Sequence, residues 1–352
     1  MKPELEKLCA DYITNREAVH KAFRFDSGDL YSVCANIFCA AGRPADTDRL
    51  KKSRKVIRKH TGCFSKFRSS KVRSILASML ALGEKPEDRM TQANEYYRLL
   101  KRKFRGTEYL VLTAFLLTDL AGKPLTEETA DRGKTIYRRM NQKHRILTDK
   151  TDSVFAMLMA YSGKSEDELT DEVESCYHTL KGKSFSSGGA QTAAQVLSMT
   201  DGSPEEKTQR LIELYDALQA SGIKYGRSDE LGPLAALSLS DTPVPDLVNG
   251  IGEADEFLKE QKFYDTKKDT EKRIMHAVMI VSDQYAGTDQ VNITVMTNTL
   301  DMLFAKQQAS RVSFALNAIQ ALAQLLAGSG KTTDKAKDET ATQTDTEKQQ
   351  DE

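Results

Sequence analysis

The sequence contains no tryptophan, no excess of charge of one sign and no long apolar run. Only 7% of its 352 residues are aromatic and 39% are hydrophobic, which is little for one large core. No charge-free apolar stretch reaches the roughly 18 residues that a membrane-spanning helix requires. We therefore expect no transmembrane segment, and the composition favours a series of small cores, each shared between neighbouring units.

Cysteine is also scarce. The chain has five cysteines, an odd number, and no two of them have C-x-x-C spacing. This pattern indicates neither a disulfide framework nor a zinc site, so we expect reduced thiols. The N-terminal stretch MKPELEKLCADYITNREAV has early acidic residues and no apolar segment, unlike a signal peptide. Together these features predict a cytoplasmic protein.

The most informative feature that is present is a repeat of about forty residues. A bulky ring or aliphatic side chain recurs at steps of 40, 40, 40, 38 and 42, at Ile57, Tyr97, Tyr137, Tyr177, Tyr215 and Phe257. Glycines recur in parallel at steps of 41, 39, 41 and 39, at Gly42, Gly83, Gly122, Gly163 and Gly202. A period between about 20 and 50 residues is typical of stacked supersecondary units. Two independent markers with one period therefore predict a repeat architecture.

Each unit is predicted to hold two helices. In residues 69–103, the segment VRSILASMLAL places its apolar residues on one face of a helix. Gly83 is expected to end this helix in the left-handed backbone conformation, and Pro86 suits the first turn of a second helix. The second helices repeat one template at offsets −7, −4, 0 and +3 from the ring, beginning with Met90, Ala93, Tyr97 and Leu100. We expect this face to pack between units.

The predicted fold is therefore all-α: a right-handed α-solenoid of six to seven helical hairpins, similar in period to HEAT and tetratricopeptide arrays. The array is expected at residues 30–287. A polar helix in residues 1–29 and two helices in residues 288–328 are expected to cap its ends, because a terminal unit lacks one neighbour. Residues 329–352 contain no large apolar residue and are expected to be a disordered polar tail.

Charge is distributed unevenly along the chain. Residues 49–145 contain 25 Lys and Arg against 9 Asp and Glu, a net of +16, so the remainder carries −16. The candidate binding residues follow the ring on successive second helices, and they are Arg58, Lys59, Arg98, Lys101, Arg102, Arg138, Arg139 and His178. If these helices stack about 8–10 Å apart, the arginines form a ladder. Such a ladder either binds an acidic protein or a nucleic-acid backbone, or is a solvated face paired with acids of adjacent units.

No catalytic, metal or cofactor site is evident from the motifs. Residues 325–332 read LLAGSGKT, close to a phosphate-binding loop, but Leu325 replaces the first glycine and a helix precedes the string. His144 lies near Asp149 and Asp152, where an acid–base pair is conceivable and helix capping by Thr148 and Asp149 is more economical. The sequence therefore predicts a protein that is not an enzyme and needs no cofactor.

Three strings carry a resemblance to a known family. They are MNQKHRILTDKTDSVFAMLMA (140–160), KGKSFSSGGAQTAAQVLSM (181–199) and SDELGPLAALSL (228–239). They resemble a bacterial all-helical family catalogued as domain of unknown function 4003, with its "HH-x-x-LT-x-x-D" and "GN-x-LQ-x-x-S-x-x-LA" steps. Lys143-His144, Leu147, Thr148 and Asp152 match the first step; Gly189, Gln191 and Leu197 match the second, where Ala190 and Thr192 depart from it. The resemblance implies a bacterial, cytosolic helical protein over residues 5–325, and it transfers no activity.

Solenoids expose extended surfaces and usually hold partners. We therefore predict a non-enzymatic protein-interaction scaffold whose partner is an unidentified protein. The alternative is nucleic-acid or polyanion binding through the basic residues of 49–145. The oligomeric state and the surface used are left open by the sequence.

Overall fold

The computed structural model describes residues 1–285, apart from residues 27, 120–122, 146, 149–151, 229 and 265–269. This part of the chain contains fourteen α-helices and two short 3-10 helices, η1 (Lys66–Arg68) and η2 (Lys262–Tyr264), and no strand. The all-α prediction is thus confirmed. The helices expected at 288–328, the tail at 329–352 and the string LLAGSGKT lie outside the described residues.

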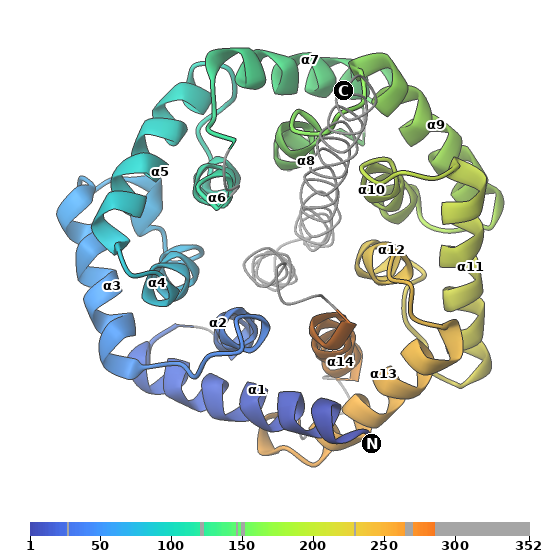
Figure 1. Ribbon diagram of the computed structural model, residues 1–352, viewed down its shortest axis with the longest axis horizontal. Helices are drawn as coiled ribbons and strands as arrows, with labels where there is room; N and C mark the ends of the chain where they lie inside the picture. The colour runs from blue at the N-terminus through green and yellow to red at the C-terminus, as the bar shows by residue number, and fades with distance from the viewer. Residues whose placement is uncertain are drawn as a thin grey trace, which may run out of the picture.

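The helices alternate between an outer and an inner layer (Figure 1). The outer helices are α1 (Pro3–Ala22), α3 (Thr47–His60), α5 (Pro86–Lys101), α7 (Glu127–Lys143), α9 (Glu166–Gly182), α11 (Pro204–Ala220) and α13 (Val244–Lys259). The inner helices are α2 (Gly28–Ala40), α4 (Arg73–Leu82), α6 (Glu108–Leu117), α8 (Asp152–Met159), α10 (Ser187–Leu197), α12 (Leu231–Ser238) and α14 (Thr270–Tyr285). Each outer helix packs on the inner helix that follows it, which makes seven hairpins.

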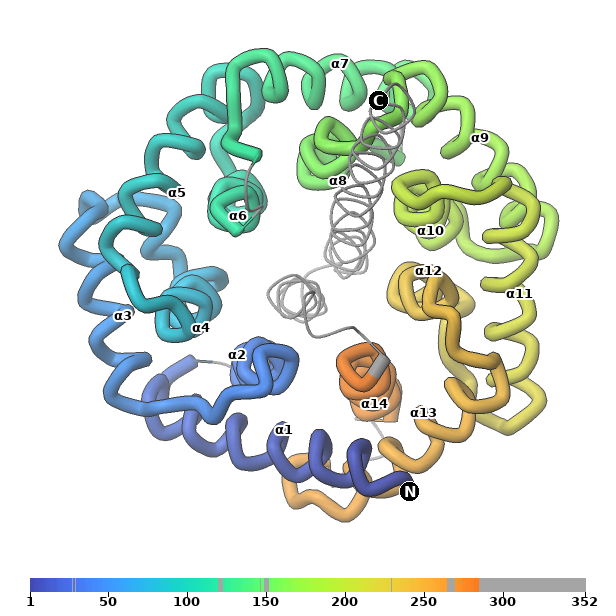
Figure 2. The backbone as a smooth tube through the Cα atoms, in the orientation of Figure 1, coloured from blue at the N-terminus to red at the C-terminus, as the bar shows by residue number. Residues whose placement is uncertain are grey.

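The seven hairpins close into a ring (Figure 2). Helix α1 packs against both α13 and α14, and α14 packs against α2, so the last hairpin contacts the first. This closure differs from the open solenoid that the repeat predicts. Helix α1, expected as a cap over residues 1–29, is the outer member of the first hairpin. The period of a repeat defines the unit but not the rotation between units, and here the rotations add up to a full turn.

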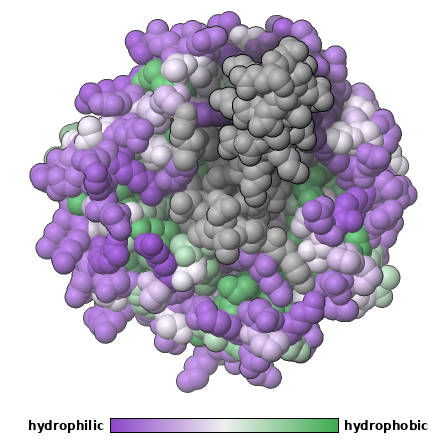
Figure 3. All heavy atoms as spheres, in the orientation of Figure 1, coloured by the Kyte–Doolittle hydropathy of each residue, from purple (hydrophilic) through white to green (hydrophobic). Residues whose placement is uncertain are grey.

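The two layers differ in how they are buried. In the inner helix α6, the sequence YLVLTAFLL is buried on every side, from Tyr109 to Leu117. The outer helix α7 buries only the stripe Ala130, Gly133, Ile136 and Met140, which follows the 3.6-residue period of an amphipathic helix. Figure 3 shows the result, because the outer rim is mainly hydrophilic and the apolar side chains lie nearer the middle. The core is therefore a continuous layer between the two sets of helices.

The ring positions of the repeat pack where the template predicts. On α5, Met90, Ala93 and Leu100 are fully buried, and Tyr97 lies half-buried against the core. Each tyrosine packs against a ring from the loop of the preceding hairpin. The pairs, with centroid distances, are Phe67–Tyr97 at 5.3 Å, Phe104–Tyr137 at 5.8 Å, His144–Tyr177 at 4.5 Å and Phe185–Tyr215 at 4.8 Å. The periodic rings thus join successive hairpins.

The glycines of the repeat do not all act alike. Gly42 and Gly202 have φ of 58° and 98°, the left-handed region that favours glycine. Gly83 has φ of −81° in an extended conformation, so the expected left-handed helix end is wrong there. Gly83 still ends α4, because its amide bonds back to the carbonyl of Leu80.

Arginines of the outer layer hold the C-terminal ends of inner helices. The Arg210 guanidinium on α11 donates to the carbonyl oxygens of Ser238, Ser240 and Thr242 at 2.6 Å each. Arg132 on α7 does the same at the end of α8, donating to the carbonyl oxygens of Ala160 and Ser162 at 3.0 Å. Carbonyls at a helix C-terminus have no partner within the helix, and a cation there also interacts favourably with the helix dipole. These arginines therefore fix each inner helix to its outer partner.

The closure between the first and last hairpins contains a buried polar network. The Tyr12 hydroxyl on α1 lies 3.2 Å from the Tyr264 hydroxyl on η2, which in turn contacts Nδ1 of His276 on α14. All three side chains are at most 5% exposed. Burial lowers the pKa of His276 to about 3 and raises the pKa of Tyr12 to about 12. The junction is thus built for a neutral imidazole.

Candidate functional site

The eight basic residues predicted as a binding column divide into two groups. Lys59 Nζ lies 3.0 Å from Glu87, Arg102 lies 2.7 Å from Glu127, Arg139 contacts Asp167, and His178 lies 3.7 Å from Glu174. Within the described ranges, no carboxylate lies within ion-pair distance of Arg58, Arg98, Lys101 and Arg138, and all four are exposed.

The paired group connects the outer helices end to end. Two of these ion pairs, Lys59–Glu87 and Arg139–Asp167, join residues 28 positions apart, and so do Lys103–Asp131 at 2.6 Å and Lys143–Asp171 at 2.9 Å. Since the repeat is about 40 residues, the C-terminal end of one outer helix meets the first half of the next. The stagger is about twelve residues, or roughly 18 Å at the rise of an α-helix.

This stagger corrects the expected arginine ladder. Stacking at 8–10 Å would bring Arg58, Arg98 and Arg138 into one continuous stripe. The stagger instead places them at equivalent points on successive outer helices, offset by roughly 18 Å along the helix axis. They occupy matching positions along the rim without forming a ladder.

Two exposed phenylalanines escaped the sequence reasoning. Phe25 is 98% exposed and Phe64 is 102% exposed, in the loops that follow α1 and α3. The loop after α1 is anchored to the start of α4, because Asp26 accepts bonds from Arg73 and Ser74. Phe25 and Phe64 thus lie in equivalent loops of the first and second hairpins. Their exposure had one indication in the sequence: neither phenylalanine continues the apolar spacing of the helix before it or the helix after it. Phe64 also lies four residues beyond the end of α3, close in the chain to the unpaired Arg58.

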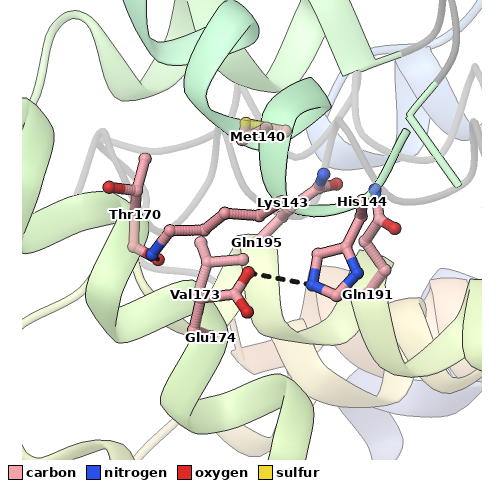
Figure 4. Close-up of a pocket in the computed structure, with 8 residues that line it drawn as sticks. All are labelled: Met140, Lys143, His144, Thr170, Val173, Glu174, Gln191 and Gln195. Carbon is pink, nitrogen blue, oxygen red and sulfur yellow. Dashed lines mark hydrogen bonds and ion pairs between the residues drawn. The ribbon is translucent and has the colours of Figure 1, made fainter.

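A pocket lies between the fourth and fifth hairpins (Figure 4). It is small, with about 10 Å³ of space open to the centre of a water-sized molecule. Its lining comes from the end of α7, from α9 and from α10, and consists of Met140, Lys143, His144, Thr170, Val173, Glu174, Gln191 and Gln195. Nε2 of His144 lies 2.9 Å from the Glu174 carboxylate, which faces it in Figure 4.

A buried carboxylate supports the floor of this pocket. One oxygen of Asp152, the first residue of α8, accepts from Nε2 of Gln195 at 2.7 Å and from Nε2 of Gln191 at 3.4 Å. Asp152 and Gln191 are 4% exposed, and Gln195 is fully buried. Because an ionised carboxylate only accepts hydrogen bonds, both amide NH₂ groups must turn toward it. The sequence placed His144 near Asp152; in the structure His144 lines the pocket, and Asp152 holds the two glutamines that line it.

The remaining reactive side chains offer no further site. Cys9, Cys34, Cys39 and Cys176 are buried free thiols, and Cys63 is exposed. Burial raises the pKa of the Cys34 and Cys176 thiols to about 12, which makes them poor nucleophiles. Among the described residues, no group of three or more His, Cys, Asp and Glu is placed to hold a metal ion. No helix in the same part of the chain is long and apolar enough to span a membrane.

Fold and pocket together define a class: an all-helical ring of seven hairpins with a polar pocket at one junction. Residues 15–309 match the family model described as a protein of unknown function, DUF4003, and the chain belongs to that family. The resemblance seen in the three sequence strings is thereby confirmed. No curated protein and no solved structure matches the chain.

Proposed function

We propose that this protein is a non-enzymatic interaction module that docks an acidic protein partner. The docking surface, which we call the Phe25–Phe64 patch, consists of Phe25, Phe64 and Arg58. The carrying observation is that two fully exposed phenylalanines lie in equivalent loops of successive hairpins, after α1 and α3, and that Phe64 follows the basic end of α3. Aromatic residues and arginine are enriched among the residues that dominate protein–protein binding energy. An isolated exposed apolar residue requires no explanation, but two large ones at equivalent places in successive hairpins support an interaction site.

The charge around the patch supports an acidic partner. Residues 49–145 carry a net charge of +16, and Arg58, Arg98 and Arg138 are exposed. Complementary charge steers encounter and excludes wrong partners more than it adds affinity. The phenylalanines would then supply the apolar anchor, and the arginines along the rim would contact a partner that extends beyond it.

The alternative is binding of nucleic acid or another polyanion through residues 49–145. The same three exposed arginines favour it, since phosphate contacts need cations that are not already paired. One observation favours the protein partner instead: Arg58, Arg98 and Arg138 are spaced too widely to form one continuous stripe along a phosphate backbone.

The test compares wild type with two variants in the native host. A benzoylphenylalanine crosslinker at position 64 captures neighbouring proteins, and each captured protein is purified and titrated against wild type, Phe25→Ser/Phe64→Ser and Arg58→Glu. We expect one acidic protein whose affinity falls at least tenfold in both variants. Lys183→Glu, an exposed charge reversal on the opposite half of the ring, is the matched control and should leave affinity unchanged.

Duplex DNA provides the opposing arm. Binding with a steep salt dependence that is lost in Arg58→Glu/Arg98→Glu/Arg138→Glu, but kept in Phe25→Ser/Phe64→Ser, would establish the polyanion alternative. Failure of every captured protein to distinguish wild type from Phe25→Ser/Phe64→Ser would refute the docking patch.

A further inference from the structure

The inner helices are apolar on every side, including the side that faces the middle of the ring. Helix α6 reads YLVLTAFLL over nine consecutive buried residues, and all eight residues of α8 are buried. At about 100° per residue, such runs cover the whole circumference of a helix. A helix that is hydrophobic all round requires neighbours all round, and the outer helices supply them on one side only.

Helix α8 shows where a further neighbour is needed. Met157 faces the outer helix α7, because a Cβ atom on Gly133 would clash with the Met157 sulfur. Met159 lies about 200° further around the helix, so it points away from α7 toward the middle of the ring (Figure 1). Among the described helices, α8 packs mainly on α7 and α6, and it reaches α10 through Asp152 at its other end. Met159 is nevertheless 0% exposed.

The size of the ring fits one helix on its axis. Packed helices lie about 8–10 Å apart, so seven of them in a closed ring stand about 9–12 Å from the central axis. A helix on that axis would lie at about the usual packing distance from all seven inner helices. Because such a helix has no side in water, its sequence should carry no charge.

The C-terminal part of the sequence contains a segment of this character. Residues 312–327 read VSFALNAIQALAQLLA, sixteen residues without a charge. As a helix they would be about 24 Å long, the length of the sixteen-residue inner helix α14. Residues 291–304 are also rich in apolar side chains, but Asp301 would bring a carboxylate into the same apolar surroundings. Charge therefore favours residues 312–327.

The path of the chain supports the same segment. Helix α14 belongs to the inner layer and ends at Tyr285, and only residues 286–311 separate it from Val312. A segment on so short a tether has an effective concentration in the millimolar range, which favours it over a separate molecule. The sequence pattern predicts a capping role for these residues, but a closed ring has no terminal unit to cap.

We propose that residues 312–327 dock in the middle of the ring as a helix and cover the inward faces of the inner helices. The segment completes the core that the seven hairpins share, so the middle of the ring is an interface within the chain. This inference is independent of the Phe25–Phe64 patch, which lies on the first two hairpins.

Photo-methionine, a diazirine analogue of nearly the size of methionine, tests this contact in the full-length protein. Met159 should crosslink to residues 312–327 of the same chain. Met157, on the opposite side of α8, is the matched control and should crosslink to α7. Trypsin releases residues 312–331 as one peptide, because this stretch has no Lys or Arg before Lys331, so mass spectrometry identifies the product.

Mixing chains with and without ¹⁵N separates crosslinks within one chain from those between two copies. Crosslinks of Met159 to residues 291–304, to a second copy, or to the described helices alone would each overturn the proposal.

A pair of substitutions tests the cover by accessibility. Ile319→Asp/Leu322→Asp puts two charges into the segment, and Ala336→Asp, in the polar tail, is the control. In a Met159→Cys background, maleimide labelling at position 159 should be at least tenfold faster with the double substitution and unchanged with Ala336→Asp. Hydrogen exchange of the outer helices reports whether the ring stays folded. Equal labelling rates in a folded double variant would show that residues 312–327 do not cover this face.

Discussion

The inner and outer helices of the ring follow different rules. An inner helix such as α6 is buried on every side, so each of its residues is constrained by packing. An outer helix such as α7 buries one stripe and exposes the rest, and its exposed charges pair across the rim. The comparison teaches that stability is concentrated in the inner layer and that the outer wall is free to vary. Substitutions at inner and outer positions test this difference.

The largest effect is expected at Gly189, near the start of α10. A Cβ atom there would overlap the backbone carbonyl of Ser228, in the loop of the next hairpin, and backbone cannot move aside as a flexible side chain can. Gly189→Ala should therefore lower the free energy of unfolding by about 3 kcal/mol. Urea denaturation followed by circular dichroism measures the change.

The control for this substitution is Gly182→Ala, at the last residue of the outer helix α9. No heavy atom lies within 4 Å of the added methyl group. Alanine has the higher helix propensity, so this variant should gain about 0.5 kcal/mol. Equal losses at both positions would contradict the distinction between the two layers.

A second effect concerns pH and the closure of the ring. His276 has a pKa of about 3 in the folded protein because burial disfavours its charged form, against about 6.5 in the unfolded chain. The unfolded state therefore binds the extra proton as pH falls below 6.5, and stability decreases in that direction. This group should cost about 2 kcal/mol between pH 7 and pH 5.

The measurement is urea denaturation at pH 7, 6 and 5. His276→Asn removes the titrating ring, so its stability should vary less over this range by the same amount. His20→Asn, at an exposed position on α1, is the matched control and should keep the pH dependence of wild type. If His276→Asn and wild type lose stability in parallel, burial of the imidazole does not control the junction.

The smallest effects are expected for the ion pairs of the outer wall. Asp131→Asn breaks the contact with Lys103, and Asp167→Asn breaks the contact with Arg139. Both aspartates are exposed, so each substitution should change the free energy of unfolding by about 0.5 kcal/mol or less, and 0.5 M NaCl should abolish the difference. A loss above about 2 kcal/mol for either would show that the rim, and not the inner layer, holds the hairpins together.

The outer helices were the predictable part of the fold. Their template of Met90, Ala93, Tyr97 and Leu100 recurs because each must present the same face to the next hairpin. Closure was not predictable, since the contacts between α1 and α14 join residues about 260 positions apart and no periodic marker records the rotation per unit. The axial register between successive outer helices could not be predicted either, because no periodic marker records it. The arginine ladder was therefore expected, although the helices are staggered.

The pocket was predictable only in fragments. His144 and Asp152 stood out in the sequence, and Gln191 belonged to the strings that carry the family resemblance. Glu174 and Gln195 could not be identified in the same way. Glu174 lies 30 residues beyond His144, on the next hairpin, and Gln195 resembles any other polar residue of a helix. From the sequence alone, helix capping by Thr148 and Asp149 was the more economical interpretation of the segment around His144. The aromatic rings that hold the equivalent position in other hairpins were not yet identified. The exposed phenylalanines were missed since burial cannot be read from a loop sequence.

The contact between α1 and α13 has a consequence for how the chain is made. Translation releases α1 about 240 residues before α13, which at 5–20 residues per second is a delay of roughly 10–50 s. During that interval the side of the first hairpin that α13 and α14 will cover, including Leu5 and Tyr12, has no neighbour. A nascent chain of this protein therefore exposes an apolar surface at the ribosome until its last hairpin emerges. We expect a cotranslational chaperone to bind this surface.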